Sequence, residues 1–512
     1  MKPSYDVEIG KVTYNGTEIP LKSTGGETPS SGWQPNEDMK WAKQVCENDV
    51  QEGFTYKVLQ MISDGYVYTD IVVPSGGAVK TSDGGYYTAN AKHTWDDTNA
   101  RVATSHTNMK LRWLIYYYTS ETPSITLLQD VMYACFDGVK FSPIFSSKKM
   151  LEYFDIINGA DLSSSVTSIS NMFNSCYSLQ TIPLLNTSSV TDMSAMFYSC
   201  YLLQTIPQLD TSSVTNMSSM FSSCYSLQTI PQLDTSKVTN MRQTFASCYS
   251  LQTIPLLNTS SVTDMYGMFY YCSVLQTIPL LDTNKVTDMK QMFYKCSLLQ
   301  TIPQLDTSSV TNMGGMFGSC SSLQTIPLLN TSSVTDMSNM FQECSSLQTI
   351  PLLNTSSVTD MGTMFFRCYS LQTIPQLDTS KVTDIRQMFR DCYSLKTIPQ
   401  LDTSNATDMY YMFANCSLLQ TISLLDINNV TSTTNMFWSC SYLEFLTMTN
   451  IKVSFSISAS TKFSQETLET LIDNLVDLTG QTAQTFTMGS TNLAKVSQEK
   501  KDLATSKNWN LN

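Results

Sequence analysis

The chain has 512 residues, of which 14% are charged, and a formal net charge of −13. This balance argues against nucleic acid or an anionic membrane as a partner, because both favour clustered Lys and Arg. The N-terminus lacks an apolar signal-peptide core and no stretch approaches 18 consecutive apolar residues, so we expect neither a signal peptide nor a membrane span.

Residues 1–21 are predicted to form a short β segment. An Asn-Gly pair at 15–16 separates two short runs of strand-forming residues, the pattern of a hairpin. A lone hairpin is only marginally stable in water, so we expect this one to dock on another surface as an anchor. Residues 22–31, "KSTGGETPSS", are predicted to be a flexible linker.

Residues 32–145 are predicted to form a small α+β domain. "NEDMKWAKQVC" favours a helix, and "GYVYTDIVV" and "MKLRWLIYYY" favour strands, with a "SDGG" turn between them. In this segment "HTWDD" places His93 near Asp96 and Asp97, which could be half of a metal or acid–base site. We favour a strand end and a turn. No phosphate loop, nucleophile elbow or zinc-binding motif is present, so we predict a protein without enzyme activity or a cofactor.

A 24-residue unit then recurs without insertion or deletion, with Phe at every 24th position from Phe173 to Phe437. Apolar residues at helical spacing in each unit predict a short helix with one buried face. "LLQTIPQL" follows it and predicts a short strand, which Pro207 should end because proline has no N–H. The predicted core positions of one unit are Val190, Met193, Phe197, Cys200, Leu203 and Ile206.

Twelve of the 14 cysteines recur at the same place in the unit, three residues after the phenylalanine. Disulfide frameworks have irregular spacing, and no second Cys or His accompanies each one as a metal ligand. We therefore predict free, buried thiols.

Such short elements are unstable alone and need stacked copies. The sequence therefore predicts an α/β solenoid over residues 146–450, a leucine-rich-repeat-like stack of about 11–12 strand–helix coils with an N-terminal cap at its start. Residues 451–512 are predicted to be a C-terminal cap with an amphipathic helix at 464–476, a strand at "QTFTMGS" and a last helix at 492–507.

A column of Asn and Asp recurs at the turn between units: Asn186, Asp210, Asp234, Asn258, Asp282 and Asp306. A row of carboxylates could bind Ca²⁺. Frequent replacement by Asn favours turn capping instead, since both side chains bond to nearby backbone. We predict no metal site.

The core positions hardly vary between copies, whereas the columns of Ser194, Ala195, Tyr198 and Ser199 vary in almost every unit. On the predicted helix these columns point away from the core. Drift on a solvated face would favour small polar residues, but aromatic residues and Arg, which are typical of binding hot spots, occur often. We therefore predict a recognition face there. Its candidate residues are Tyr198, Tyr266, Tyr270, Tyr271, Tyr294, Lys295, Phe366, Arg367, Arg386, Arg390, Tyr410, Tyr411 and Trp438.

The pattern "MF..C.SLQTIP" resembles the repeat of BspA-like bacterial surface leucine-rich repeat proteins, over about residues 155–450. The tail at 463–509 is similar to the C-terminal cap of such proteins, including bacteriophage-encoded ones. Short N-terminal β segments with Gly-rich linkers are similar to the anchors of phage appendage proteins. The resemblance implies host-surface or cell-surface binding and supplies no catalytic residues to carry over.

The resemblance favours a non-enzymatic adhesion protein on a phage virion, attached to a virion protein through residues 1–21. Its partner would be a host-surface protein or polysaccharide, and a homo-oligomer stays open. Three alternatives stay open: an exported bacterial cell-surface adhesin, a structural virion decoration protein, and a glycan-processing enzyme using residues 32–130. The strand face, with its recurring Gln-Thr, could instead suit a repeating polymer.

Overall fold

The computed structural model describes residues 161–512 throughout and, before them, residues 143, 145–149 and 151 and the strands β1–β9. The chain divides into two compact units. Unit 1 comprises Met1–Val214 with Ser223–Leu233, and unit 2 comprises Thr215–Ser222 with Asp234–Asn512.

Unit 1 contains a six-stranded sheet in the order β5-β4-β6-β3-β7-β9, in which only β7 and β9 pair in parallel. The strand predicted in "MKLRWLIYYY" is present as β6. The sheet also takes in β9, from the segment assigned to the N-terminal cap. Its strands are β3 (Thr55–Met61), β4 (Ala78–Thr81), β5 (Tyr86–Thr88), β6 (Trp113–Tyr118), β7 (Val131–Asp137) and β9 (Tyr153–Ile157).

Two smaller pairings complete this unit. Strands β1 (Val12–Tyr14) and β2 (Thr17–Ile19) pair antiparallel, which confirms the predicted hairpin. Strands β8 (Lys140–Phe141) and β10 (Asp161–Leu162) pair in parallel. The predicted linker at 22–31, the helix at 36–46, the strand at 65–73 and the residues His93, Asp96 and Asp97 lie outside the described residues.

The repeat core of unit 1 begins at Phe145. Its ring centroid lies 5.1 Å from that of Phe173, which in turn stacks 5.5 Å from Phe197. The Cys176 thiol donates to the Phe145 carbonyl at 3.0 Å, just as Cys200 donates to Phe173 one coil later. Phe145 thus stands where an earlier coil would place its phenylalanine.

The prediction of a helix in each 24-residue repeat is wrong. Residues 163–450, all described, contain no helix; in its place lie consecutive turns. In one coil of unit 2 the N–H groups of Met316 and Cys320 donate to carbonyls three residues earlier, both at 3.0 Å. Gly315 and Ser319, which directly precede these two residues, have φ of 62° and 58°, a left-handed backbone that no right-handed helix contains.

The intervening N–H groups of this segment bond to the next coil. Those of Met313 and Phe317 donate at 3.0 Å to the carbonyls of Asp336 and Met340, which lie 23 residues later. A helix would satisfy its N–H groups internally and leave none for a neighbour. The alternating turns therefore provide the hydrogen bonds that hold successive coils together.

The prediction of a strand in each 24-residue repeat is also wrong for most coils. Within residues 163–450 only β11 (Thr421–Asp426) and β12 (Phe445–Thr449) form a ladder, and they pair in parallel. Ser423 and Thr447 stand there in the column that holds proline from Pro183 to Pro399. Proline has no N–H to donate to a ladder. Regular strand pairing within these residues therefore occurs only where a residue with a backbone N–H replaces the proline.

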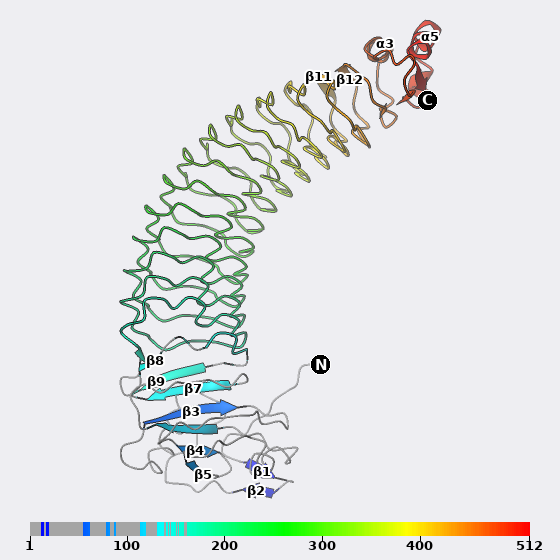
Figure 1. The fold of residues 1–512 in the computed structure, drawn as a ribbon. Helices are drawn as coiled ribbons and strands as arrows, with labels where there is room; N and C mark the ends of the chain where they lie inside the picture. Colours follow the sequence, from blue (N-terminus) through cyan, green and yellow to red (C-terminus); the bar gives the residue numbers. More distant parts are fainter. Residues whose placement is uncertain are drawn as a thin grey trace. The chain divides into compact units, whose positions relative to one another are not determined.

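The core of the repeats agrees with the sequence. All six predicted core residues of the coil at 190–206 are at most 7% exposed. In unit 2 the phenylalanine rings stack from Phe221 to Phe437, and within residues 234–450 each coil of the repeat solenoid lies on the next (Figure 1). The twelve repeat cysteines are free and buried, as predicted, and burial raises the pKa of the Cys320 thiol to about 12.

The C-terminal segment closes the stack with three parallel strands and three helices. Helix α3 (Gln465–Asp473) buries Leu468, Leu471 and Ile472, and Ser464 caps its first turn, which confirms the predicted amphipathic helix. In place of the single helix predicted at 492–507, the structure has two helices, α4 (Ser490–Leu493) and α5 (Gln498–Ser506). The strands are β13 (Phe455–Ser456), β14 (Gln484–Thr487) and β15 (Trp509–Leu511). In the part of the chain that is described, no helix has the length and apolar character needed to cross a membrane.

Candidate recognition face

The variable columns lie on the turns that replace the predicted helix. The columns of Ala195 and Ser199 are the two left-handed positions of each coil, and those of Ser194 and Tyr198 precede them. Most side chains in these columns, and all of the candidate recognition residues, are exposed or half-buried. We call this surface the turn face.

Five candidate residues gather in two successive coils of unit 2, and we call them the tyrosine cluster: Tyr266, Tyr270, Tyr271, Tyr294 and Lys295. The rings of Tyr270 and Tyr294 stack at 5.4 Å with an interplanar angle of 14°. The Tyr271 ring packs 4.5 Å from Tyr270 at a steeper angle. Together these three rings form a half-buried aromatic surface, which we call the plate although the Tyr271 ring is tilted.

Cations edge this plate. The Lys295 Nζ donates to the Tyr271 Oη at 2.6 Å, and this hydrogen bond raises the pKa of the lysine. The Arg242 guanidinium lies 3.8 Å from the centre of the Tyr266 ring. Burial raises the pKa of Tyr270 to about 12, so its hydroxyl stays protonated at neutral pH. The cluster therefore offers ring faces, phenol donors and positive charge.

The next coil makes room for the plate because it carries glycine in the same columns. A Cβ at Gly318 would lie 2.6 Å from the Cδ2 atom of Tyr294, which is closer than any real contact. The Tyr294 ring thus occupies the space that a side chain at Gly318 would need. Lys290 reaches across the same coil, with its Nζ 3.8 Å from the Asp336 carboxylate.

We expect Gly318→Ala to displace the Tyr294 ring without unfolding the coil, since a ring on a flexible side chain can rotate away. The Tyr270–Tyr294 stack should be lost, and the near-ultraviolet circular dichroism of the tyrosines should change. Gly314→Ser is the control, because the atoms that face this glycine belong to Asp336, and it should leave the tyrosine signal unchanged. An unchanged spectrum for Gly318→Ala would show that the plate does not depend on this contact.

A second group lies further along unit 2, and we call it the arginine cluster: Phe366, Arg390, Tyr410, Tyr411 and Trp438. The Arg390 guanidinium lies 5.5 Å from the Phe366 ring centre and 4.6 Å from that of Tyr411. The Tyr411 ring meets Trp438 edge-on at 6.4 Å. Trp438 is 53% exposed, so a large apolar ring faces solvent here.

Arg367 belongs instead to a polar ladder in the Ser199 column. Its Nη1 donates to Glu343 at 3.1 Å and its Nε to Asp391 at 3.5 Å. Ser319 donates to the far oxygen of Glu343 at 2.9 Å, and Asn415 donates to Asp391 at 2.5 Å. Both acceptors lie in neighbouring coils, so the positive charge of Arg367 is paired with carboxylates of the same chain.

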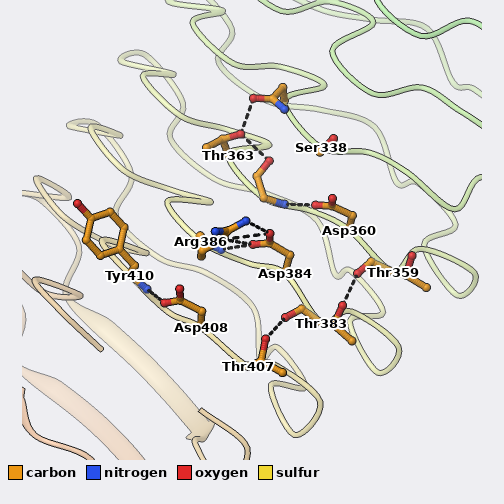
Figure 2. A network of polar contacts seen from close by, with 12 residues as sticks. Ser338, Thr359, Asp360, Thr363, Thr383, Asp384, Arg386, Thr407, Asp408 and Tyr410 are labelled. Carbon is orange, nitrogen blue, oxygen red and sulfur yellow. Dashed lines mark hydrogen bonds and ion pairs between the residues drawn. The ribbon is translucent and has the colours of Figure 1, made fainter. Parts of the chain in front are cut away.

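Arg386 is likewise paired within the chain. Its Nη2 lies 2.5 Å from the Asp384 carboxylate (Figure 2). Asp384, with Asp360 and Asp408, belongs to a column whose carboxylates accept from the N–H two residues later. Burial raises the pKa of Asp360.

The Asn/Asp column considered for calcium forms turns of the same kind. The Ser188 N–H donates to Asn186 at 3.2 Å and the Ser308 N–H to Asp306 at 3.0 Å. Hydrogen bonds from Ser308 lower the pKa of the Asp306 carboxyl. The turn-capping interpretation is therefore confirmed. Within the described residues, no group of three or more potential metal ligands gathers.

A family model now bears on these repeats. The model described as "Mycoplasma protein of unknown function, DUF285" matches residues 167–280, 272–376 and 369–470, which together span more than half of the chain. The chain belongs to this family. The predicted membership of a leucine-rich-type repeat family is confirmed in this form, and such repeats are consistent with a non-enzymatic surface or binding protein.

Comparison of the structure finds other leucine-rich repeat proteins. One from Eubacterium ventriosum has 16% identity and a TM-score of 0.33, over 62% of this chain and 89% of the other. One from T. pallidum has 17% identity and a TM-score of 0.19, over 54% and 91%. A plant peptide hormone receptor, RGFR1 in complex with RGF2, has 11% identity and a TM-score of 0.20, over 73% and 86%. Likenesses of this size carry no argument about what the DUF285 repeats bind. No curated protein matches the sequence.

The structure also shows aromatic residues that the sequence interpretation missed. Tyr177, Tyr201 and Tyr225 of unit 1 stack at 4.7 and 4.6 Å, in the column that follows each DUF285 cysteine. This column also holds tyrosine at Tyr249, Tyr369 and Tyr393 and serine in the remaining coils, and these runs of tyrosine were the signal available in the sequence. The predicted residue Tyr198 also lies in unit 1, where it is 39% exposed, and is in neither cluster.

Proposed function

We propose that the chain is a non-enzymatic binding protein that recognises a host-surface protein or polysaccharide through the turn face of its DUF285 repeats. The observation that carries the proposal is the grouping of the tyrosine and arginine clusters. The candidate residues are spread over seven coils, yet ten of the aromatic and basic ones meet in two groups of rings and cations. Aromatic rings with adjacent cations suit both glycan faces and protein hot spots.

The proposal extends to the location of the protein. We infer display on a phage virion, on a tail or head appendage, with residues 1–21 attached to a virion protein. The hairpin of β1 and β2 supports this, because a two-stranded ribbon requires a partner surface. Quantitative detection of the protein in purified virions and in host cell fractions tests it. Recovery only from the membrane or wall fraction would favour the exported adhesin instead.

The tyrosine cluster gives the test of recognition. We expect Tyr270→Ser with Tyr271→Ser to weaken binding of the purified chain to host cells by about tenfold or more. Serine occupies both columns in other coils, as at Ser222 and Ser247, so the melting temperature should fall by only a few degrees.

The control is Tyr369→Ser with Tyr393→Ser. These rings stack at 5.4 Å in the column after the cysteine, which also holds serine elsewhere. Host-cell binding should be unaffected in this control. Equal loss in both double variants would mean that the tyrosine cluster has no special role.

A further inference from the structure

A cleft of about 930 Å³ opens in unit 2 away from the turn face. It is formed by the segment that follows the proline of four successive coils. Leu328 and Leu352 stand side by side in it and are 62% and 63% exposed. Large apolar side chains exposed in adjacent coils of a soluble stack indicate a contact surface.

The sequence of these coils changes in a correlated way. The two central coils read "PLLN" and place Leu328 with Asn330 and Leu352 with Asn354, whereas the coils on either side read "PQLD". The flanking coils place Gln304 with Asp306 and Gln376 with Asp378 at the two ends of the cleft. The floor is therefore apolar and neutral, and both ends carry a carboxylate.

Both carboxylates are ionised at neutral pH. Hydrogen bonds from Ser308 lower the pKa of Asp306, and those from Ser380 lower the pKa of Asp378. Both side chains are exposed. A ligand along the cleft meets negative charge at each end and only uncharged groups between.

The presence of leucine in place of glutamine at 328 and 352 also removes hydrogen-bond donors from the floor of the cleft. The Gln304 amide donates to the Leu328 carbonyl at 2.7 Å, and the Gln376 amide donates to the Gln400 carbonyl at 2.7 Å. A leucine cannot donate in this way. The carbonyls of Leu352 and Gln376, each one coil after a leucine, are therefore without this side-chain donor.

We propose that this cleft binds an extended peptide segment of a partner protein, with one apolar side chain between two basic side chains on the same face. The apolar side chain contacts Leu328 and Leu352, the two basic side chains meet Asp306 and Asp378, and peptide N–H groups face the floor carbonyls. The inference goes beyond the proposed function, since it assigns a second surface with a different ligand.

The dimensions fit this occupant. Successive coils are spaced by 5.6–5.8 Å between their phenylalanine rings, so the two carboxylates, three coils apart, are about 17 Å apart, and flexible basic side chains at the ends of a slightly shorter segment can reach both. In an extended strand, residues i, i+2 and i+4 share one face and span about 14 Å. A basic–x–apolar–x–basic sequence therefore brings all three side chains over the cleft.

The experiment measures binding of fluorescein-labelled acetyl-Lys-Thr-Leu-Thr-Lys-amide to the full chain by fluorescence anisotropy. We expect saturable binding that weakens with added salt. Replacing the central leucine of the peptide by serine, or both lysines by glutamate, should weaken it by about tenfold or more. Equal binding of the three peptides would overturn the proposal.

The variants copy neighbouring coils, so the fold accepts them. Leu328→Gln with Leu352→Gln reproduces the "PQLD" coils, and Asp306→Asn with Asp378→Asn keeps the turn that Asn330 and Asn354 make. Each pair should weaken binding by about tenfold, while Leu184→Gln, an equally exposed leucine in unit 1, should not. Unchanged affinity in both pairs would refute the proposal. A self-association of the chain that Leu328→Gln with Leu352→Gln abolishes in sedimentation would assign the cleft to a second copy instead.

Discussion

Phe317→Ala is expected to lower the free energy of unfolding by about 3–5 kcal/mol, the usual cost of removing a fully buried phenylalanine. Phe317 is 0% exposed, and its ring stacks 5.8 Å from those of Phe293 and Phe341. The Cys344 thiol donates to its carbonyl at 3.0 Å. The substitution would therefore open a cavity between the rings of Phe293 and Phe341, in the middle of a continuous stack.

The repeat architecture determines how this loss is observed. Each coil packs mainly on its neighbours, so a cavity in one coil weakens the interfaces on either side of it. We expect denaturant unfolding of Phe317→Ala to separate into two transitions, while the unmodified repeats unfold together. Tyr393→Ser, which changes a half-exposed ring, is the control. A loss below about 1 kcal/mol would show that the stack relaxes around the cavity.

The repeat and its core were predictable because they rest on periodicity. Every unit places the same apolar residues at the same spacing, and stacking is the arrangement that buries them all. Val190, Phe197 and Cys200 are buried for this reason. The column of Asn and Asp was interpreted correctly as well, since either residue can accept the N–H bond that closes the turn.

The helix was mistaken because consecutive turns also bring residues three and four apart to one side. The left-handed columns held the contrary signal. Gly267, Gly315, Asn171 and Asn339 occupy the column of Ala195, and these residue types adopt positive φ most readily. Occupants such as Gln291 concealed that preference. The left-handed backbone at these positions is stabilised by hydrogen bonds to the next coil, and the sequence of a single 24-residue repeat does not reveal them.

The candidate face was predictable only as a set of columns. The sequence identifies variable positions with aromatic and basic residues, but not which of them meet. Tyr270 and Tyr294 stack because they share a column in adjacent coils and because Gly318 leaves space. Arg367 occupies a neighbouring column, yet its partners are the acidic residues Glu343 and Asp391 of adjacent coils. Separating recognition from cohesion required the contacts between coils.

Arg367 and Asp391 make this distinction testable. The Asp391 carboxylate is only 7% exposed and depends on Arg367, Arg390 and Asn415 for its polar contacts. Arg367→Ser leaves this carboxylate short of one cation. Loss of a partner from a buried pair costs several kcal/mol, but Arg367 is itself 43% exposed. With that discount for solvent screening, we expect a loss of about 1–3 kcal/mol in the free energy of unfolding.

The double variant Arg367→Ser with Asp391→Ser supplies the control, because serine stands in this column at Ser247, Ser319 and Ser439. It removes the charge together with its partner, so we expect it to be at least as stable as Arg367→Ser alone, with a coupling energy of about 1–2 kcal/mol in the double-mutant cycle. Arg386→Ser, whose pair with Asp384 is more exposed, should cost less than about 1 kcal/mol. If Arg367→Ser instead weakens host-cell binding and leaves unfolding unchanged, then the arginine belongs to the recognition surface and the ladder does not hold the coils together.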